Sequence, residues 1–315
     1  MTTGTNVKIS RIAIISGGTS GEREISISSA RGMHEALVAS GKYQDVAVFD
    51  VGHNIVSLIQ DLVNFKPDVI LNALHGVGGE DGVIQGVLET LGIPYTHSGV
   101  TASAIAMDKV YSRIIFSHAK IPVPTWGVYP SEQLSQLTNM PFVMKPRCEG
   151  SSLGISIIKS NEDLIQALAA WKYGEFALVE EYIPGKEVQT AVFDGVALGT
   201  IEIRPHREFF DYRAKYTVGE TDHIMPADIP DDVYAHVQEL AERAYHAIGC
   251  RGMTRLDFML KYENGTWTPY LLELNTQPGM TPCSLVPDIA KHLGWSYLEV
   301  IERMLISAVN YWNSN

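Results

Sequence analysis

The stretch at 271–287, LLELNTQPGMTPCSLVP, decides how this sequence is interpreted. Its leucines are typical of a buried strand, yet Glu273 and Asn275 interrupt the apolar run. A carboxylate inside a sheet costs several kcal/mol unless other groups compensate its charge. Side chains alternate between the two faces of a strand, so Glu273 and Asn275 share one face. The stretch therefore raises the question of what compensates Glu273.

The strand expected just before this stretch, at 252–260, carries Arg255 and Asp257, again two residues apart. If the two strands pair across the turn YENG, two carboxylates, an amide oxygen and a guanidinium meet on one face. Oxygen ligands of this kind, completed by water and phosphate, suit Mg²⁺. The alternative is an ordinary salt bridge between Arg255 and one acid. Asn275 and the glycine loop QPGM beyond it favour the metal site.

The whole chain excludes several classes of protein. Its 315 residues are 45% hydrophobic and 19% charged, which predicts a globular protein of two or three domains. The formal charge of −12 opposes binding to nucleic acid. We expect no membrane span, because the apolar runs are short, and no secretory signal, because MTTGTNVKIS lacks an apolar segment. The cysteines, which lack the spacing of disulfide frameworks or zinc sites, are Cys148, Cys250 and Cys283.

The first hundred residues alternate between strands and helices, as expected for a parallel βαβ sheet. The strands are expected at 11–16, 45–50 and 68–74, and the helices at 24–40, 55–64 and 82–91.

The remainder of the chain mixes strands and helices differently. Strands are expected at 140–146, 155–158, 176–182, 187–193, 196–203 and 268–275, and helices after Ser160, from Pro230 to Gly249 and at 296–312. Asp194-Gly195, between two of these strands, signals a tight hairpin. Residues 204–228 are polar, irregular and too long for a mere connection, which indicates a lid or binding loop.

Two further segments could bind a nucleotide. Lys145 ends an apolar strand and precedes PRCEGSSLG, whose small residues offer backbone N–H groups to a phosphate without the Walker pattern. Taken alone, such a loop is more often a surface turn. The segment VEEYIPGKE at 179–187 could meet an adenine at an inter-domain hinge, and its alternative is a charged surface strand.

The amino-terminal loop SGGTSGERE suggests a dinucleotide site, with Asp50 at the end of the second strand as the ribose ligand. The glycine spacing fails, however, because Ser16 would stand at the first glycine. A carboxylate at a helix N-terminus, such as Glu22, instead suits a cationic ligand such as an amino group. His75 in HGVGGEDG follows a parallel strand, where open α/β sheets bind ligands, although a lone histidine is usually structural.

Together these stretches resemble the D-alanine–D-alanine ligases of the ATP-grasp superfamily. The resemblance runs through nearly the whole chain, in the family's order, in GGTSGEREIS, LHGVGGEDG, ASAIAMDK, EGSSLGIS, DYRAKY, RLDFML and LLELNTQPGMTPCSLVP. It implies an α/β protein, α+β in its ATP-grasp part. The implied domains are an amino-terminal Rossmann-like domain at 1–98, a central ATP-grasp subdomain at 99–182 and a carboxy-terminal subdomain at 183–315 with the lid loop 204–228.

The resemblance also implies the ligands. ATP is expected between the central and carboxy-terminal sheets, in contact with Lys109, Lys145, Ser152, Glu180, Glu181, Tyr182, Ile183, Glu187 and Phe210. Two Mg²⁺ ions, for which Mn²⁺ could substitute, are expected on Asp257, Glu273 and Asn275. These ions and the phosphates would compensate the carboxylate of the opening stretch.

In the family's reaction, one D-alanine carboxylate attacks the γ-phosphate of ATP, and the amine of a second D-alanine then displaces phosphate from the acyl phosphate. Such transfer needs positioning and charge neutralisation more than covalent help. The residues implied at the oxyanion are Arg255 and Gly279. Those implied at the substrates are Glu22, Ser151, Tyr216, His75, Lys215, Ser284 and Leu285. Tyr216 points to an amine rather than an alcohol as acceptor.

One position departs from the family. KPRCEGSS carries Arg147-Cys148 where relatives more often have a small residue followed by arginine. The departure leaves the phosphate contacts of this loop open. Cys148 is not expected to be catalytic, because acyl-phosphate chemistry needs no thiol nucleophile.

The expected protein is a cytoplasmic, homodimeric, ATP-dependent D-alanine–D-alanine ligase of peptidoglycan precursor synthesis. Its expected partners are small molecules, with neither nucleic acid nor membrane among them. A carboxylate–amine ligase of the same fold with another acceptor is an alternative. A nicotinamide-dependent oxidoreductase, based on the first βαβ unit, and an inactive nucleotide-binding protein are further alternatives.

Overall fold

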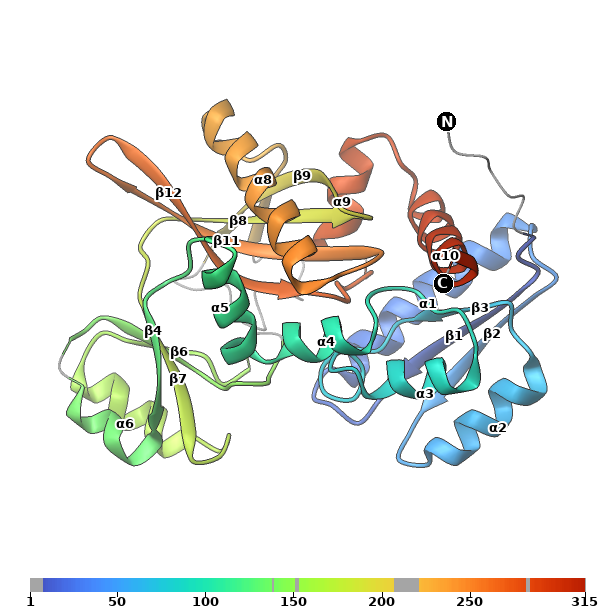
Figure 1. The fold of residues 1–315 in the computed structure, drawn as a ribbon, viewed down its shortest axis with the longest axis horizontal. Coiled ribbons are helices and arrows are strands. Elements are labelled where there is room, and N and C mark those ends of the chain that lie inside the picture. Colours follow the sequence, from blue (N-terminus) through green and yellow to red (C-terminus); the bar gives the residue numbers. More distant parts are fainter. Residues whose placement is uncertain (1–7, 138, 151–152, 207–220, 282–283, 315) are drawn as a thin grey trace.

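The computed structural model describes residues 8–137, 139–150, 153–206, 221–281 and 284–314. Within these ranges the chain forms three sheets with helices packed against them, so the expected α/β class is confirmed (Figure 1). The domain boundaries expected after residues 98 and 182 stay predictions. No helix in the described part of the chain is long and apolar enough to cross a membrane.

The amino-terminal sheet is parallel, in the order β2-β1-β3, as the sequence predicts. Its strands are β1 (Arg11–Gly17), β2 (Asp45–Val51) and β3 (Val69–Asn72), and its helices are α1 (Arg23–Ser40), α2 (Ile55–Phe65) and α3 (Val83–Leu91). The alternation along β1 separates two cores. Ile12 and Ile14 pack on the side of α1, whereas Ala13 and Ile15 pack on the side of α2 and α3.

The central sheet is antiparallel, in the order β4-β7-β5-β6. It contains β4 (Trp126–Pro130), β5 (Phe142–Lys145), β6 (Ser156–Ile158) and β7 (Phe176–Glu181), with the short helix η1 (Ser131–Gln136) and α6 (Asn161–Ala170) against it. Ser160 caps α6 as expected, because its hydroxyl accepts from the Asp163 N–H at 3.2 Å.

The carboxy-terminal sheet is antiparallel, in the order β10-β9-β8-β11-β12. Its strands are β8 (Lys186–Phe193), β9 (Val196–Pro205), β10 (Thr221–Ile224), β11 (Met253–Glu263) and β12 (Thr266–Asn275). The helix α8 (Asp231–Ile248) covers one face with α4 (Val100–Met107) and α5 (Lys109–His118). The other face packs against α9 (Leu285–His292), and α10 (Tyr297–Ser314) packs against α9, α1 and β3. Asp194 and Gly195 form the expected hairpin, with φ angles of 47° and 85°.

Two connections that the sequence predicts as loop or turn are partly strand. The segment 204–228 is not irregular at its ends, because β9 runs to Pro205 and pairs there with Thr221 of β10. The turn between β11 and β12 is Asn264-Gly265 alone, with φ angles of 52° and 80°, so both strands extend beyond the expected ends. In both cases the strands continue to pair through residues whose composition is typical of a loop or a turn.

The helix α10 returns the chain to the amino-terminal sheet. It packs against α1, and Lys42 just after α1 pairs with Glu302 of α10 at 2.7 Å (Figure 1). Arg251, which precedes β11, lies over the ring of Tyr311 at 4.1 Å and over that of Tyr95 at 4.5 Å. The amino- and carboxy-terminal parts therefore share a packed interface.

Candidate active site

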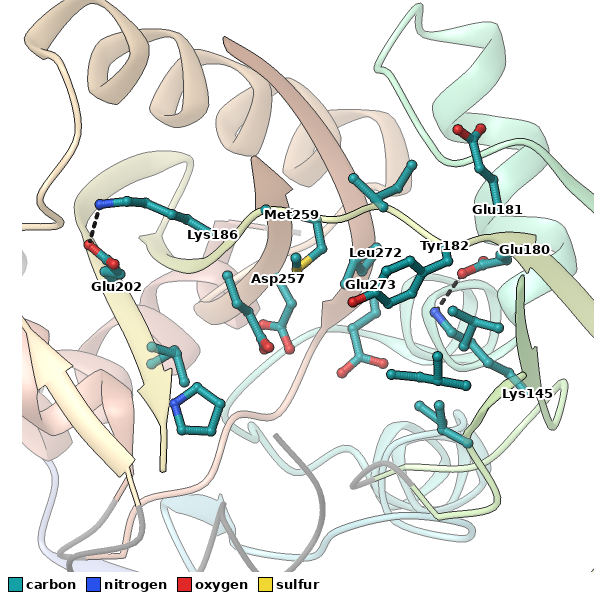
Figure 2. Close-up of a pocket in the computed structure, with 18 of the residues that line it drawn as sticks. Lys145, Glu180, Glu181, Tyr182, Lys186, Glu202, Asp257, Met259, Leu272 and Glu273 are labelled. Carbon is teal, nitrogen blue, oxygen red and sulfur yellow. Dashed lines mark hydrogen bonds and ion pairs between the residues drawn. The ribbon is translucent and has the colours of Figure 1, made fainter. Parts of the chain in front are cut away.

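A cavity of about 590 Å³ lies between the central and carboxy-terminal sheets (Figure 2). Strands of both sheets line it, so the expected nucleotide cleft is present in the fold. The site residues that line it are Lys145, Glu180, Glu181, Tyr182, Ile183, Glu187, Asp257 and Glu273. Its apolar walls come from Val143, Ile155, Ile157, Ile203, Met259 and Leu272. An apolar cavity with a polar end suits a nucleotide.

Glu180 has a buried carboxylate that holds two cations. Lys145 approaches it at 2.5 Å and Arg113 at 2.6 Å. Burial opposes ionisation of Glu180, but the charges of Arg113 and Lys145 overcome burial and lower its pKa to about 2. The Glu180 side chain thus fixes Lys145, while its predicted contact with adenine or ribose stays a prediction. Arg113 also donates to the backbone carbonyl of Leu272 in β12.

The opposite end of the cavity carries a second charge network. Glu202 is buried and accepts from Arg204 at 2.6 Å, while Lys186 lies 3.3 Å away (Figure 2). Lys186 also donates to the backbone carbonyl of Asp228 at 2.6 Å. This network joins β8 and β9 to the chain that follows β10. The sequence analysis did not single out these residues, although a glutamate within the apolar stretch GTIEI was a usable signal.

The two strands of the predicted oxygen cluster pair as expected. Asp257 lies opposite Glu273, and Arg255 lies opposite Asn275. Arg255 also makes the alternative salt bridge, because its guanidinium donates to both oxygens of Asp257 at 2.7 and 2.9 Å. Arg255 lies 3.7 Å from Glu273. The cluster and the salt bridge therefore coexist.

The donor set has the chemistry of a Mg²⁺ site. Figure 2 shows Asp257 and Glu273 pointing their carboxylates into the same part of the cavity. The described residues contain no group of three His, Cys, Asp or Glu that could hold a metal, so the third protein oxygen would come from the Asn275 amide. Asp257 and Glu273 line the larger cavity, whereas Asn275 lines a smaller adjoining cavity. The Asn275 Oδ1 also accepts from the Gln277 N–H at 2.7 Å. Two carboxylates and an amide leave positions for water and phosphate, as Mg²⁺ prefers.

A smaller cavity of about 50 Å³ adjoins the first, and Glu273 lines both. It brings together side chains that are far apart in the sequence. The predicted residues that line it are Glu22, His75, Lys109, Arg255, Asn275 and Gly279. Ser284 lies beside Gly279, because a Cβ at that glycine would stand 2.9 Å from the Ser284 hydroxyl. Ser284 is also the N-cap of α9, which begins with Leu285.

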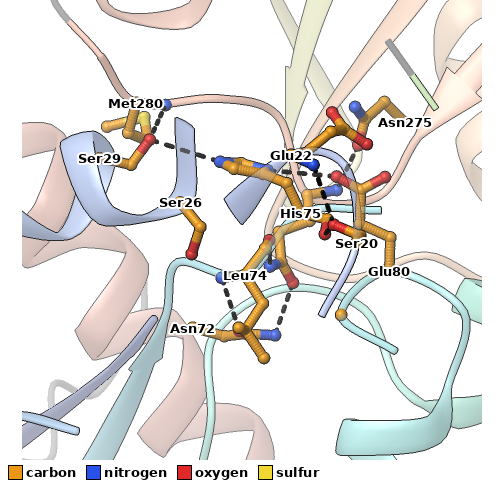
Figure 3. Close-up of polar contacts among 12 residues, drawn as sticks. Ser20, Glu22, Ser26, Ser29, Asn72, Leu74, His75, Glu80, Asn275 and Met280 are labelled. Carbon is orange, nitrogen blue, oxygen red and sulfur yellow. Dashed lines mark hydrogen bonds and ion pairs between the residues drawn. The ribbon is translucent and has the colours of Figure 1, made fainter. Parts of the chain in front are cut away.

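His75 is held by a buried network (Figure 3). Its Nδ1 lies 3.2 Å from Glu80, and its Nε2 lies 3.3 Å from the Ser29 hydroxyl. The Ser20 hydroxyl donates to the backbone carbonyl of His75 at 2.8 Å. The sequence analysis identified His75 but missed these three partners, although Glu80 stands in the quoted stretch HGVGGEDG.

Glu22 lies at the N-cap of α1, is only 4% exposed and makes no side-chain capping bond. A Cβ at Gly76 or Gly150 would stand 2.7 or 2.5 Å from its Oε2, so both positions have room only for glycine while Glu22 keeps its place. Gly76 also has a φ angle of +70°, which favours glycine. The carboxylate thus lies between loops of two different parts of the fold.

Lys109 lines the smaller cavity and donates to the backbone carbonyl of Glu149 at 2.6 Å. Burial lowers the pKa of its amine, although the nearby charge of Glu273 acts in the opposite direction. Its predicted role at the phosphates stays a prediction.

Asp50, the candidate ribose ligand of a dinucleotide site, is engaged elsewhere. It pairs with Arg23 at 2.9 Å, and Arg23 donates to the backbone carbonyl of Gly18 at 3.0 Å. A side chain at Gly17 would collide with Asp50. Asp50 thus connects the end of β2 to the glycine loop through Arg23. The interpretation of Asp50 as a ribose ligand of a dinucleotide site gains no support.

Several predicted residues cannot be placed. Those that lie outside the described residues are Ser151, Ser152, Phe210, Lys215 and Tyr216. Their roles stay predictions.

Comparisons with known proteins identify the family of the chain. The family model described as D-ala D-ala ligase C-terminus matches residues 123–306. The D-alanine--D-alanine ligase of Gluconobacter oxydans is 43% identical over 304 residues, which cover 95% of this chain and 99% of the relative. That of Methylorubrum populi is 45% identical over 306 residues, covering 94% and 97%.

A crystal structure of D-alanine--D-alanine ligase from Bacillus anthracis, complexed with ATP, superposes with a TM-score of 0.79 at 32% identity. The superposition covers 98% of this chain and 99% of that one. A second crystal structure of the Bacillus anthracis ligase gives a TM-score of 0.81 at 33% identity. The chain therefore belongs to the D-alanine–D-alanine ligase family.

Proposed function

We propose that this protein joins two D-alanines to D-alanyl-D-alanine with ATP, through an acyl phosphate, for peptidoglycan precursor synthesis. The observation that carries the proposal is the shared wall of the two cavities. Glu273 lines both the nucleotide-sized cavity and the small cavity that holds Glu22 and Arg255. A γ-phosphate and a small amino acid could therefore meet beside the same carboxylate.

ATP is proposed to lie in the larger cavity, with its adenine near the segment 180–183 and its phosphates toward Lys145 and Lys109. Lys145 is already positioned by Glu180 at 2.5 Å, so it needs little reorganisation when phosphate arrives. Asp257, Glu273 and Asn275 would hold Mg²⁺, or Mn²⁺ in its place. The bound metal would neutralise phosphate charge during transfer.

The first D-alanine is proposed to lie in the smaller cavity. Glu22 would hold its ammonium group, since a buried carboxylate favours a cation over a neutral ligand. Arg255 and the backbone N–H of Gly279 would stabilise the oxyanion that forms when the second amine attacks. Ser284, beside Gly279, and Leu285 would hold that second substrate.

The proposal also specifies the acceptor, which is the second substrate. A D-alanine acceptor predicts dipeptide, whereas a hydroxy acid such as D-lactate would give an ester. We expect Tyr216→Phe to raise the proportion of ester when both acceptors are supplied. Equal product ratios for the two proteins would remove Tyr216 from acceptor selection.

The decisive assay measures phosphate release from ATP with D-alanine, with L-alanine as control, and identifies the product by mass spectrometry. We expect release only with D-alanine and a product with the mass of the dipeptide. A product formed only with a different amine would support the alternative ligase of this fold. Oxidation of NADH without phosphate release would overturn the proposal.

We also propose that the protein is a cytoplasmic homodimer. ATP is a cytoplasmic substrate, and the helix α2 exposes apolar side chains that a second copy could cover. These are Ile55, Val56 and Val63. Light scattering after size-exclusion chromatography should give twice the chain mass of 34.7 kDa. A mass of one chain at micromolar concentration would contradict the dimer.

A further inference from the structure

The loop that follows β5 is attached to the start of α5 by an ion pair. The Arg147 Nε donates to both oxygens of Asp108 at 2.8 Å, and another guanidinium nitrogen lies 2.7 Å from the same carboxylate. The guanidinium carbon lies 5.0 Å from the centre of the Tyr111 ring. A forked arginine–carboxylate pair fixes direction as well as distance.

Asp108 is also the N-cap residue of α5. Its Oδ1 accepts from the backbone N–H groups of Val110 at 3.0 Å and Tyr111 at 3.3 Å, which caps α5. Asp108 therefore joins the first turn of α5 to the guanidinium of Arg147.

Two more hydrogen bonds join the same segments, and both involve Lys109. Its backbone N–H donates to the Arg147 carbonyl at 3.0 Å, and its Nζ donates to the Glu149 carbonyl at 2.6 Å. The loop then passes Gly150, where an added Cβ would stand 2.5 Å from the Glu22 Oε2. The Arg147–Asp108 ion pair is therefore connected, through contacts of the loop 147–150, to both Lys109 and Glu22.

We propose that Arg147 is a positioning residue for nucleotide binding, which rests on the proposed ATP-dependent function. With Asp108 it clamps the loop 147–150 onto the start of α5 and keeps Lys109 and the loop in register at the phosphate end of the site. In this proposal Arg147 acts through Asp108, which engages its guanidinium, rather than by binding phosphate.

The experiment is a double-mutant cycle with Arg147→Ala and Asp108→Asn. Asparagine caps helices about as well as aspartate, so Asp108→Asn removes the charge of the pair and keeps the cap. The readout is the dissociation constant of adenylyl imidodiphosphate with Mg²⁺, measured by calorimetry, which needs no ligation. We expect each single variant to bind about five-fold more weakly, and the double variant to bind no more weakly than the worse single.

Two controls accompany the cycle. Arg11→Ala removes a similar arginine, which pairs with Asp45 at 3.3 Å and lies 4.6 Å from the ring of Phe65, far from either cavity wall. It should bind the nucleotide normally. Arg147→Lys keeps the charge but loses the fork, and should fall between the native protein and Arg147→Ala. Thermal unfolding confirms that each variant is folded.

Native affinity in Arg147→Ala would overturn the clamp. So would weak binding in Arg147→Ala with native binding in Asp108→Asn, because that pattern identifies a direct phosphate contact. Failure of the proposed function has a different signature, since the unaltered protein would then neither bind the nucleotide nor release phosphate with D-alanine.

Discussion

The two cavities are constructed in different ways. The larger one is walled by strands, and its buried acid Glu180 is matched by Lys145 and Arg113. Half of the residues that line the smaller one lie in loops, and a Cβ at Gly76 or Gly150 would collide with the carboxylate of Glu22. The larger cavity, proposed to bind the nucleotide, thus depends on paired charge, whereas the smaller one, proposed to bind the amino acid, adds a close steric fit around Glu22. Changes of charge should damage the first, and an added methyl group should damage the second.

The largest effect is expected where the two cavities meet. Glu273→Gln keeps the shape and removes a charge that both sides use, so ligation should fall by about 1,000-fold while the fold survives. Phosphate release measured across a magnesium titration checks this. The matched control is Glu263→Gln, which alters an exposed acid paired with Lys261 at 3.1 Å. Normal turnover of Glu273→Gln with ordinary magnesium dependence would remove Glu273 from the metal site.

On the charge-dependent side, Glu180→Gln leaves Arg113 and Lys145 buried without their counter-charge. Breaking a buried pair in this way costs about 3–5 kcal/mol, so the free energy of unfolding should fall by that order. Urea unfolding at neutral pH measures the loss. A difference close to zero between the two proteins would show that water or another acid compensates the cations.

The same carboxylate predicts a pH dependence. Its pKa is lowered in the folded protein from the ordinary 4.5 to about 2, so its stabilisation is present above pH 4.5 and is lost as the pH falls toward 2. The difference in unfolding free energy between the native protein and Glu180→Gln should therefore shrink as the pH is lowered through this window. If the difference in unfolding free energy between the two proteins stays constant from about pH 6 to about pH 3, the lowered pKa of Glu180 is contradicted.

On the sterically tight side, Gly150→Ala places a methyl group 2.5 Å from the Glu22 carboxylate. We expect the KM for the first D-alanine to rise about ten-fold, with a smaller change in nucleotide affinity. Gly52→Ala is the control, because no atom lies within 4 Å of its added methyl group. An equal loss for both substrates would mean that the two cavities are not separable in this way.

The smallest effect is expected at Cys148. Partial desolvation of the thiol of Cys148, and secondarily the charge of Asp108, raise its pKa, which opposes a role as nucleophile. Cys148→Ser should change kcat by less than about two-fold, since it replaces one small side chain by another. A loss comparable to that of Glu273→Gln, with nucleotide binding intact, would show that the thiol takes part in the reaction.

The parts of the site that could be predicted are those whose sequence signal lies within a single strand or a single turn. The period of two in RLDF and LELN placed Arg255, Asp257, Glu273 and Asn275 on one face, and the structure confirms that pairing. The hairpin at Asp194 was predicted for a similar reason, because its two turn residues carry the signal themselves.

The parts that could not be predicted depend on contacts between distant segments. Arg113 lies 67 residues from Glu180, and nothing in the helix KVYSRIIFSH shows that its one buried arginine faces an acid in another sheet. The pairing of Thr221 with Pro205 likewise depends on how the chain returns. Local patterns state which residues share a face, whereas the partner across an interface is chosen by tertiary packing.

The return of α10 to the first sheet has a consequence for synthesis on the ribosome. Met33 and Leu37 of α1 belong to the same core as Ile301 and Met304 of α10, so this face of the first sheet is covered only in part, by α1, until almost the whole chain has been translated. Domains generally fold in the order of their synthesis. The amino-terminal part lacks a portion of its core until α10 has been synthesised. A nascent chain arrested before α10 should therefore expose an apolar surface that chaperones recognise.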